Sequence, residues 1–196
     1  MPTDLILRAE LVAMQAEDRR VRDELLKAGT LSDGYNPDMA AVHSRNAARL
    51  REIIAQSGWP ARTLVGVDGE EAAWMVLQHA IGDPELQRRG VSLLEQAVAQ
   101  SEAPPWQLAY LVDRIAFFEG RPQRYGTQFD YDEQGYMVVY TVENPERIDQ
   151  LRQSAGLEPL GDRVPPREHQ TPLAPEKLRQ YQTGSVAWAK AVGWRA

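Results

Sequence analysis

The sequence contains no cysteine, which excludes a disulfide scaffold, a cysteine-ligated zinc or iron–sulfur site and a thiol nucleophile. It also has no apolar run long enough to span a bilayer. Basic residues are not in excess, because 22 Lys and Arg face 28 Asp and Glu, and this argues against a general nucleic-acid or anionic-membrane binder. The apolar stretch 5–7 is too short for a secretory signal, so we expect a cytoplasmic protein.

What the chain does have is enough apolar material for one domain with a real core: 196 residues, of which 43% are hydrophobic. Its charge is uneven, since residues 163–196 carry six basic side chains against two acidic ones. We therefore expect a single helical domain over residues 1–161 and a proline-containing basic tail over residues 162–196. The tail either packs on the acidic body of the same chain or binds a partner.

Most of the sequence has helical patterning with clear boundaries. Three segments, which begin at Asn36, Asp83 and Asn144, combine a capping side chain, a proline and an acid, the typical order at a helix start. Apolar spacing and terminal glycines then predict helices over residues 5–27, 36–58, 68–81, 83–101, 104–119, 144–155 and 185–192.

One region departs from this pattern. Residues 125–131 and 136–142 are rich in aromatic and β-branched side chains and flank a turn, which predicts a β-hairpin. Five prolines in residues 158–175 predict an extended strap. The expected fold class is mainly α (α+β): an antiparallel helical bundle or array with one hairpin near 124–142 and an extended C-terminal tail.

Polar residues inside otherwise apolar helices mark the candidate site. Gln78 and His79 lie near the end of the segment 72–81, and the residues before them are apolar on every side of the predicted helix. Each of the two polar side chains therefore needs a hydrogen-bond partner or a ligand. Asp83 lies four residues after His79, a spacing that lets a carboxylate orient an imidazole. His79 is either a general acid or base, or a core histidine bonded to a backbone carbonyl.

The segment 108–118 repeats this arrangement with Asp113 and Arg114, and Tyr110 lies one helical turn before them. The chain then enters the first strand through 120–128. There Tyr125 and Thr127 lie on one face of the predicted strand and Gln128 lies on the other. Gly126 has no side chain, so a ligand or another backbone segment can approach closely. This segment either lines a ligand site or forms a hairpin corner.

The sequence predicts no metal site and no cofactor. His43 lies in an exposed-looking stretch and His169 in the proline strap, and neither forms a His-x-x-x-His or Glu-x-x-His pair. A phosphate-cradling glycine loop and a Gly-x-Ser-x-Gly elbow are also missing.

Taken in order, the motifs resemble a bacterial family known as a domain of unknown function, over about residues 10–161. They are Gln78-His79-Ala80-Ile81 with Asp83, the Asp113-Arg114 pair, and Tyr125-Gly126-Thr127-Gln128, with Asp18 and Arg22 among the flanking matches. The family pattern has aspartate where this chain has His43 and Ile81. The resemblance implies a site at these motifs and supplies no reaction, and Asp83 or His43 are the residues that could compensate for the aspartate missing at position 81.

Two functions follow as hypotheses. The first is a small metal-independent enzyme performing acid/base chemistry, hydrolysis included, on a small polar molecule or peptide. In it His79 transfers protons, Asp83 or Asp113 orients it, Arg114 holds an anionic group, and the residues that position the substrate are Gln78, Tyr110, Tyr125, Thr127 and Gln128. The second is a non-catalytic binding module that uses the helical surface and the basic tail, with Asp113 and Arg114 as a structural ion pair. The enzyme hypothesis requires one cavity that is lined by His79, Arg114 and Gln128.

Overall fold

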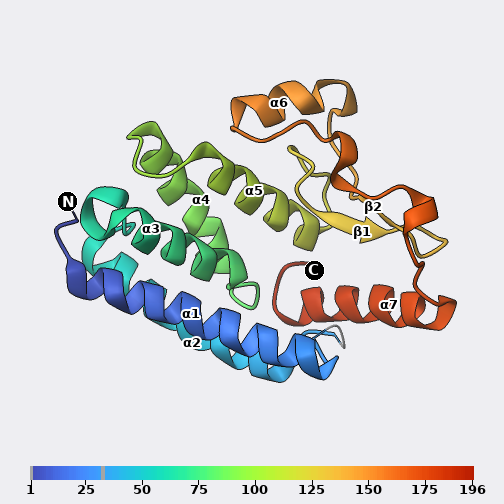
Figure 1. Cartoon of the computed structure of the whole chain (residues 1–196), viewed down its shortest axis with the longest axis horizontal. Coiled ribbons are helices and arrows are strands. Elements are labelled where there is room, and N and C mark those ends of the chain that lie inside the picture. Colours follow the sequence, from blue (N-terminus) through green and yellow to red (C-terminus); the bar gives the residue numbers. More distant parts are fainter. Residues whose placement is uncertain (1, 32–33) are drawn as a thin grey trace. The chain divides into compact units, whose positions relative to one another are not determined.

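The computed structural model describes residues 2–31 and 34–196, and the chain divides into two compact units, Met1–Gln107 and Leu108–Ala196. The architecture is mainly α-helical with one small antiparallel sheet of two strands (Figure 1), which confirms the predicted fold class. The units divide the chain at residue 107, within a helix, whereas the sequence places its domain boundary at residue 161.

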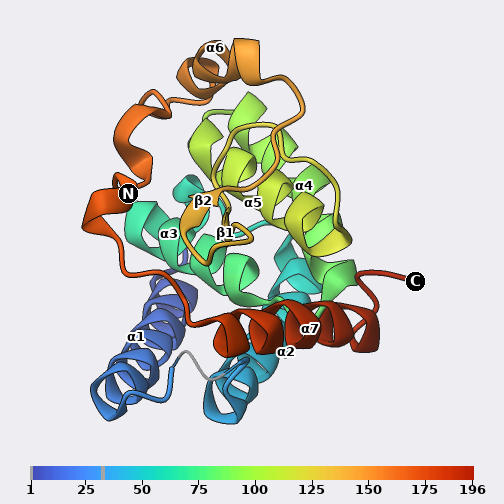
Figure 2. The ribbon, with the colours of Figure 1, turned by 90° about the vertical axis from the view of Figure 1, so that its right-hand side faces the viewer.

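The first unit contains four helices and the start of a fifth. They are α1 (Leu5–Ala28), α2 (Pro37–Ser57), α3 (Arg62–His79), α4 (Pro84–Ala99) and α5 (Pro105–Glu119), which continues into the second unit. The helix α1 lies against both α2 and α3, as the two ribbon views show (Figures 1 and 2). Three helices therefore share one interior.

Side chains cap α1, α2 and α4, the last two at the residues that the sequence predicts. The Asp4 carboxylate accepts a hydrogen bond from Leu7 N at the start of α1, and Asn36 and Asp83 cap α2 and α4 in the same way. The helix α3 differs from the predicted range of 68–81, because a first turn from Arg62 precedes a kink at Gly66 and the helix ends at His79. Gly66 has a φ of 77°, a left-handed conformation that glycine adopts without strain.

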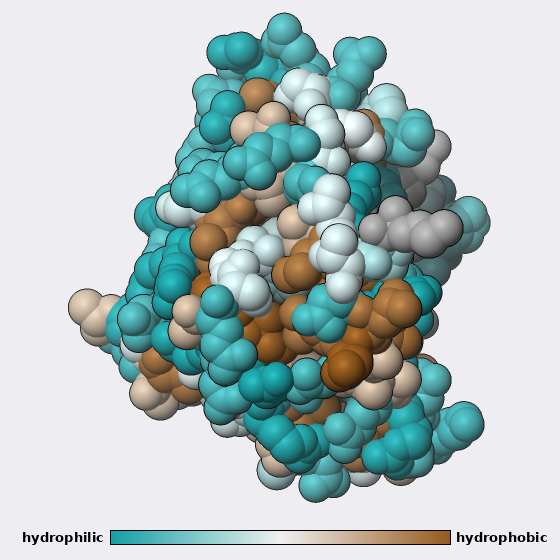
Figure 3. Space-filling view, turned by 90° about the vertical axis from the view of Figure 1, so that its left-hand side faces the viewer, coloured by the Kyte–Doolittle hydropathy of each residue, from teal (hydrophilic) through white to brown (hydrophobic). Residues whose placement is uncertain are grey.

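The core of the first unit is built from fully buried aliphatic side chains that face inward from these helices. Examples are Leu11 on α1, Leu50 and Ile53 on α2, Leu77 on α3 and Leu94 on α4. Hydrophobic side chains also reach the surface, and some are visible among the hydrophilic ones in Figure 3. In this unit the exposed large ones include Leu5, Ile6 and Val67.

The second unit contains the predicted hairpin in a shorter form. The strands β1 (Phe129–Tyr131) and β2 (Met137–Val139) pair antiparallel, with Phe129 opposite Val139. Residues 125–128, which the sequence assigns to the first strand, stay outside it, and the backbone N–H groups of Tyr125 and Thr127 bond to the Asp113 carboxylate instead. The Asp113 side chain of α5 thus takes the place of a neighbouring strand as the hydrogen-bond partner of this backbone.

The segment 158–175, for which the sequence predicts an extended strap, contains short helical turns. Two short 3₁₀ helices, η2 (Gly161–Arg163) and η3 (Arg167–His169), lie within the proline-rich segment. The helix α6 (Ile148–Ser154) follows a 3₁₀ turn, η1 (Pro145–Arg147), and α7 (Pro175–Ala191) begins ten residues before the predicted 185–192.

Residues 162–196 pack within the second unit. The Tyr181 ring contacts Tyr131 edge-on, and the Trp188 and Trp194 rings both contact Phe118 of α5. Arg195 donates from Nε to the Phe118 carbonyl. Tyr181, Trp188, Trp194 and Arg195 of the tail therefore have partners on α5 or the hairpin of their own chain.

Candidate functional site

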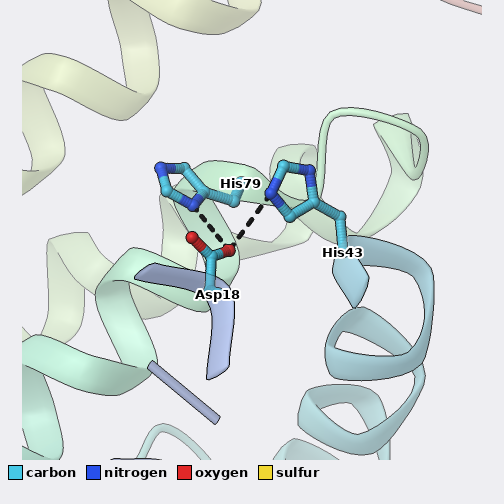
Figure 4. Close-up of side chains that lie close together, drawn as sticks. All are labelled: Asp18, His43 and His79. Atoms are coloured by element: carbon cyan, nitrogen blue, oxygen red, sulfur yellow. Dashed lines mark hydrogen bonds and ion pairs between the residues drawn. The ribbon is translucent and has the colours of Figure 1, made fainter. Parts of the chain in front are cut away.

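Three polar side chains from three helices of the first unit converge on one point (Figure 4). Asp18 comes from α1, His43 from α2 and His79 from the last residue of α3. The Oδ2 atom of Asp18 lies 2.9 Å from His79 Nδ1 and 3.1 Å from His43 Nε2. The imidazole centroids are 5.0 Å apart. One carboxylate oxygen therefore contacts both imidazoles.

Helix geometry explains why Asp18 is inside. It lies seven residues, or two turns, after Leu11, so both side chains point into the interior of the unit. Only 2% of Asp18 is exposed. Its second oxygen, Oδ1, is buried and has no hydrogen-bond partner within residues 2–31 and 34–196. Such an oxygen is costly to leave unsatisfied.

The hydrogen bonds define the histidine tautomers. The Tyr35 hydroxyl lies 2.8 Å from His43 Nδ1. If this hydroxyl donates to Nδ1, the ring hydrogen of His43 is on Nε2, the atom 3.1 Å from Asp18 Oδ2, and Nδ1–H of His79 donates to the same oxygen. In this assignment both imidazoles are neutral, Asp18 is ionised, and His79 Nε2 carries the lone pair.

Charge and burial set the ionisation of these groups. Burial alone would raise the pKa of Asp18, but hydrogen bonds from His43 and His79 outweigh it and hold the pKa below its ordinary value. Burial, followed by the charge of Asp18, raises the pKa of Tyr35 to about 12. At neutral pH the site thus combines a buried carboxylate with a protonated phenol.

A cavity of about 180 Å³ opens beside the two histidines. Arg22 of α1 and Ile81 line it together with residues 31 and 34–36. The lining residues are Arg22, Leu31, Gly34, Tyr35, Asn36, Met39, His43, His79 and Ile81. His43 and Ile81 therefore both line this cavity.

The structure gives Asp83 a different role from the one its spacing suggests. Its carboxylate accepts from Arg51 Nε and Nη2 at 2.6 and 2.5 Å and caps α4 through Leu86 N. The carboxylate that contacts the His79 imidazole is that of Asp18, whereas the sequence spacing suggests Asp83. Gln78 is buried, and its backbone carbonyl accepts a hydrogen bond from Gln87 Nε2.

In the second unit the structure brings together Asp113, Tyr125, Thr127 and Gln128. Asp113 is fully buried and accepts from the backbone N–H groups of Tyr125 and Thr127 and from the Thr127 hydroxyl. Gln128 Nε2 donates to that same hydroxyl. Burial raises the pKa of Asp113, although these hydrogen bonds oppose it. These contacts describe a hairpin corner organised by a carboxylate.

The other two predicted residues of this unit, Arg114 and Tyr110, lie on α5 as well. Burial lowers the pKa of Arg114 to about 10, and the guanidinium remains charged at neutral pH. The Tyr110 hydroxyl accepts a hydrogen bond from Arg163. Because His79 belongs to the first unit and these residues to the second, the hollow shared by His79, Arg114 and Gln128 stays a prediction.

Asp18 and Tyr35 are members of the cluster that the sequence does not assign to a site. A signal for Asp18 exists: the apolar series Leu7, Leu11, Met14, Val21 and Leu25 skips the interior position that position 18 occupies. His43 looks exposed from its neighbours Ser44 and Arg45, yet only 11% of its side chain is accessible. His169, the third histidine, is exposed as expected.

The first unit is thus a helical scaffold around an aspartate and two histidines. The model of a family of unknown function (DUF6624) matches residues 5–171, and the chain belongs to this family. No curated protein and no solved structure matches the chain. Within the described residues, every helix falls short of the length and apolar character that crossing a membrane requires.

Proposed function

We propose that the protein is an enzyme that performs acid/base chemistry on a small polar molecule or peptide at the cavity beside His43 and His79. The observation that carries this proposal is the 2.9 Å contact between Asp18 Oδ2 and His79 Nδ1 at the edge of that cavity. A buried carboxylate that holds Nδ1–H fixes the imidazole in the tautomer whose Nε2 accepts a proton.

In this mechanism His79 Nε2 takes a proton from water or from a substrate hydroxyl as the bond to the substrate forms. The imidazolium that results lies next to the ionised Asp18, which stabilises its positive charge. The proton then passes from Nε2 to the leaving group, so His79 returns to its neutral state. Hydrolysis of a small ester or amide fits this sequence of steps.

The cavity supports a small substrate. Its volume of about 180 Å³ lies below the range of roughly 300–1,000 Å³ that is usual for drug-sized ligands. Arg22 supplies a positive charge at its lining, which favours a substrate with an anionic group. The net charge of −6 supports a small-molecule substrate over a nucleic acid.

A panel of small chromogenic esters, amides and phosphate esters tests the proposal. The wild-type protein is assayed with a chelator present, next to His79→Gln and Asp18→Asn. We expect turnover by the wild type and a loss of at least about 100-fold in both variants, because general acid/base groups contribute factors of this size. The control is His169→Gln, which changes an exposed histidine and should retain full activity.

Two results would contradict the proposal. One is turnover by His79→Gln at the wild-type rate, which would show that another group transfers the proton. The other is wild-type protein that turns over no compound in the panel yet binds acidic peptides through residues 162–196, as the alternative binding module requires.

A further inference from the structure

We propose that Asp18, His43 and His79 form a binding site for one divalent first-row transition-metal ion. One nitrogen of each imidazole and one carboxylate oxygen all lie within 4.8 Å of one another. The three ligands come from α1, α2 and α3, so the site exists only in the folded first unit. Nothing in the spacing of the three residues along the chain reveals it.

The distances suit an ion. Bonds of about 2.0–2.1 Å from a metal to nitrogen or oxygen place neighbouring ligand atoms about 3.0–3.4 Å apart. Asp18 Oδ2 already lies 2.9 Å from His79 Nδ1 and 3.1 Å from His43 Nε2. The remaining nitrogen-to-nitrogen distance can close by rotation of the imidazoles, since 28% of the His79 side chain and 11% of His43 are accessible.

Two further observations favour a metal-binding site over a cluster that only stabilises the fold. The buried Asp18 Oδ1 has no hydrogen-bond partner in the described part of the chain, and a metal ion that took both carboxylate oxygens would satisfy it. Tyr35 contacts His43 Nδ1, the nitrogen opposite the proposed ligand atom. Metal-bound histidines usually have such an outer hydrogen bond, which fixes the ring orientation.

The ligand types select the metal. Two imidazoles and one carboxylate favour Zn²⁺, Co²⁺, Ni²⁺ or Fe²⁺ over Mg²⁺ and Ca²⁺, which prefer oxygen ligands. Three ligands from residues 2–31 and 34–196 leave at least one coordination position for a further group, as in catalytic rather than structural zinc sites. The cavity borders both histidines, so water or a substrate oxygen can reach that position.

This inference goes beyond the proposed function, because metal binding and proton transfer require different states of one atom, His79 Nδ1. Proton transfer needs a hydrogen on His79 Nδ1, whereas the metal replaces that hydrogen. The metal-bound form therefore excludes the proposed role of His79 as a base, and the two forms can be measured separately.

Direct metal binding tests the inference without any substrate. The full chain is stripped with a chelator, and Zn²⁺ is titrated in competition with a chromophoric chelator, while Co²⁺ reports the ligand geometry through its visible absorption. We expect one ion per chain and visible Co²⁺ bands of low coordination number. His43→Ala and His79→Ala should each bind at least about 100-fold more weakly, and Tyr35→Phe about 10-fold more weakly, as outer hydrogen bonds contribute 10- to 100-fold.

The matched control is His169→Ala, which removes the one histidine outside the cluster and should bind like the wild type. Circular dichroism checks that each variant is folded, and Asp18→Asn, which keeps the side-chain volume, serves where an alanine variant unfolds. The inference is overturned if the wild type binds no stoichiometric ion, or if the cluster variants bind as tightly as His169→Ala. Stoichiometric binding without turnover in chelator would leave the metal site standing and reject the proposed function.

Discussion

At the residue scale, the buried carboxylate of Asp113 shows how one side chain holds a loop. Its oxygens accept hydrogen bonds from the backbone N–H groups of Arg124, Tyr125 and Thr127 and from the Thr127 hydroxyl. All four donors come from a segment of four residues. The charged acceptor therefore holds the entry to the hairpin.

We predict that Asp113→Asn destabilises the protein by about 3 kcal/mol, because an amide directs N–H groups at donors and leaves buried groups unsatisfied. Urea denaturation followed by circular dichroism measures the change. The control is Glu133→Gln on the exposed hairpin turn, for which we expect less than about 0.5 kcal/mol. Equal stabilities of the two variants would show that Asp113 does not hold the loop.

At the scale of elements, the packing of α4 on α3 depends on Gly90. A Cβ atom added there would lie 2.6 Å from Leu77 Cδ2 and 2.9 Å from Leu77 Cδ1. Leu77 is fully buried, so its side chain cannot move away without disturbing the core. The glycine thus allows two helices to approach closely.

Gly90→Ala should therefore destabilise the protein by about 1–2 kcal/mol, since overpacking outweighs the gain in helix propensity. The matched control is Gly184→Ala in α7, where an added Cβ meets nothing within 4 Å. That variant should gain up to about 1 kcal/mol from propensity alone. Thermal unfolding compares the two, and a stabilised Gly90→Ala would refute the packing argument.

Elements with local signals could be predicted from the sequence. Asn36 and Asp83 cap helices at the predicted places because a capping side chain acts on N–H groups two or three residues away. Strand β1 is shorter than predicted because the carboxylate of Asp113, on α5, binds backbone N–H groups within residues 124–127. Helix α7 begins ten residues earlier than predicted and contains Gly184 in its interior.

At the scale of the whole molecule, the candidate site depends on contacts between helices that no local sequence pattern predicts. Asp18, His43 and His79 lie far apart in sequence and meet only because α1 packs on both α2 and α3. His79 could be predicted because it is a polar residue in an apolar helix. Asp18 as its partner could not, since the nearer Asp83 offers a plausible spacing and only the fold directs Asp83 to Arg51.

The pH dependence of overall stability is also set by contacts between helices. The guanidinium of Arg49 lowers the pKa of Glu10. Burial opposes ionisation of Asp83, but hydrogen bonds from Arg51 and Leu86 N outweigh it and lower that pKa too. Both groups stabilise the fold above their ordinary pKa values and lose this contribution as the pH falls through the lowered values.

Glu70 acts in the opposite direction. It is fully buried on α3, accepts a hydrogen bond from Gln107 Nε2, and lies 3.7 Å from Arg62 Nε. Burial, opposed by these two neighbours, raises its pKa from 4.5 to about 7. The folded state therefore holds a proton that the unfolded state releases near pH 4.5, and folding is destabilised as the pH rises from there to about 7.

Glu70→Gln removes this titration while keeping an oxygen that Gln107 can bond. Relative to the wild type, the variant should gain about 3 kcal/mol in free energy of unfolding between pH 4.5 and pH 8, because a shift from 4.5 to about 7 corresponds to that amount. Urea denaturation at half-unit pH steps measures both curves, with Glu95→Gln, at an exposed position on α4, expected to follow the wild type. Parallel curves for wild type and Glu70→Gln would mean that Glu70 stays ionised in the folded protein, and that Arg62 and Gln107 compensate fully for its burial.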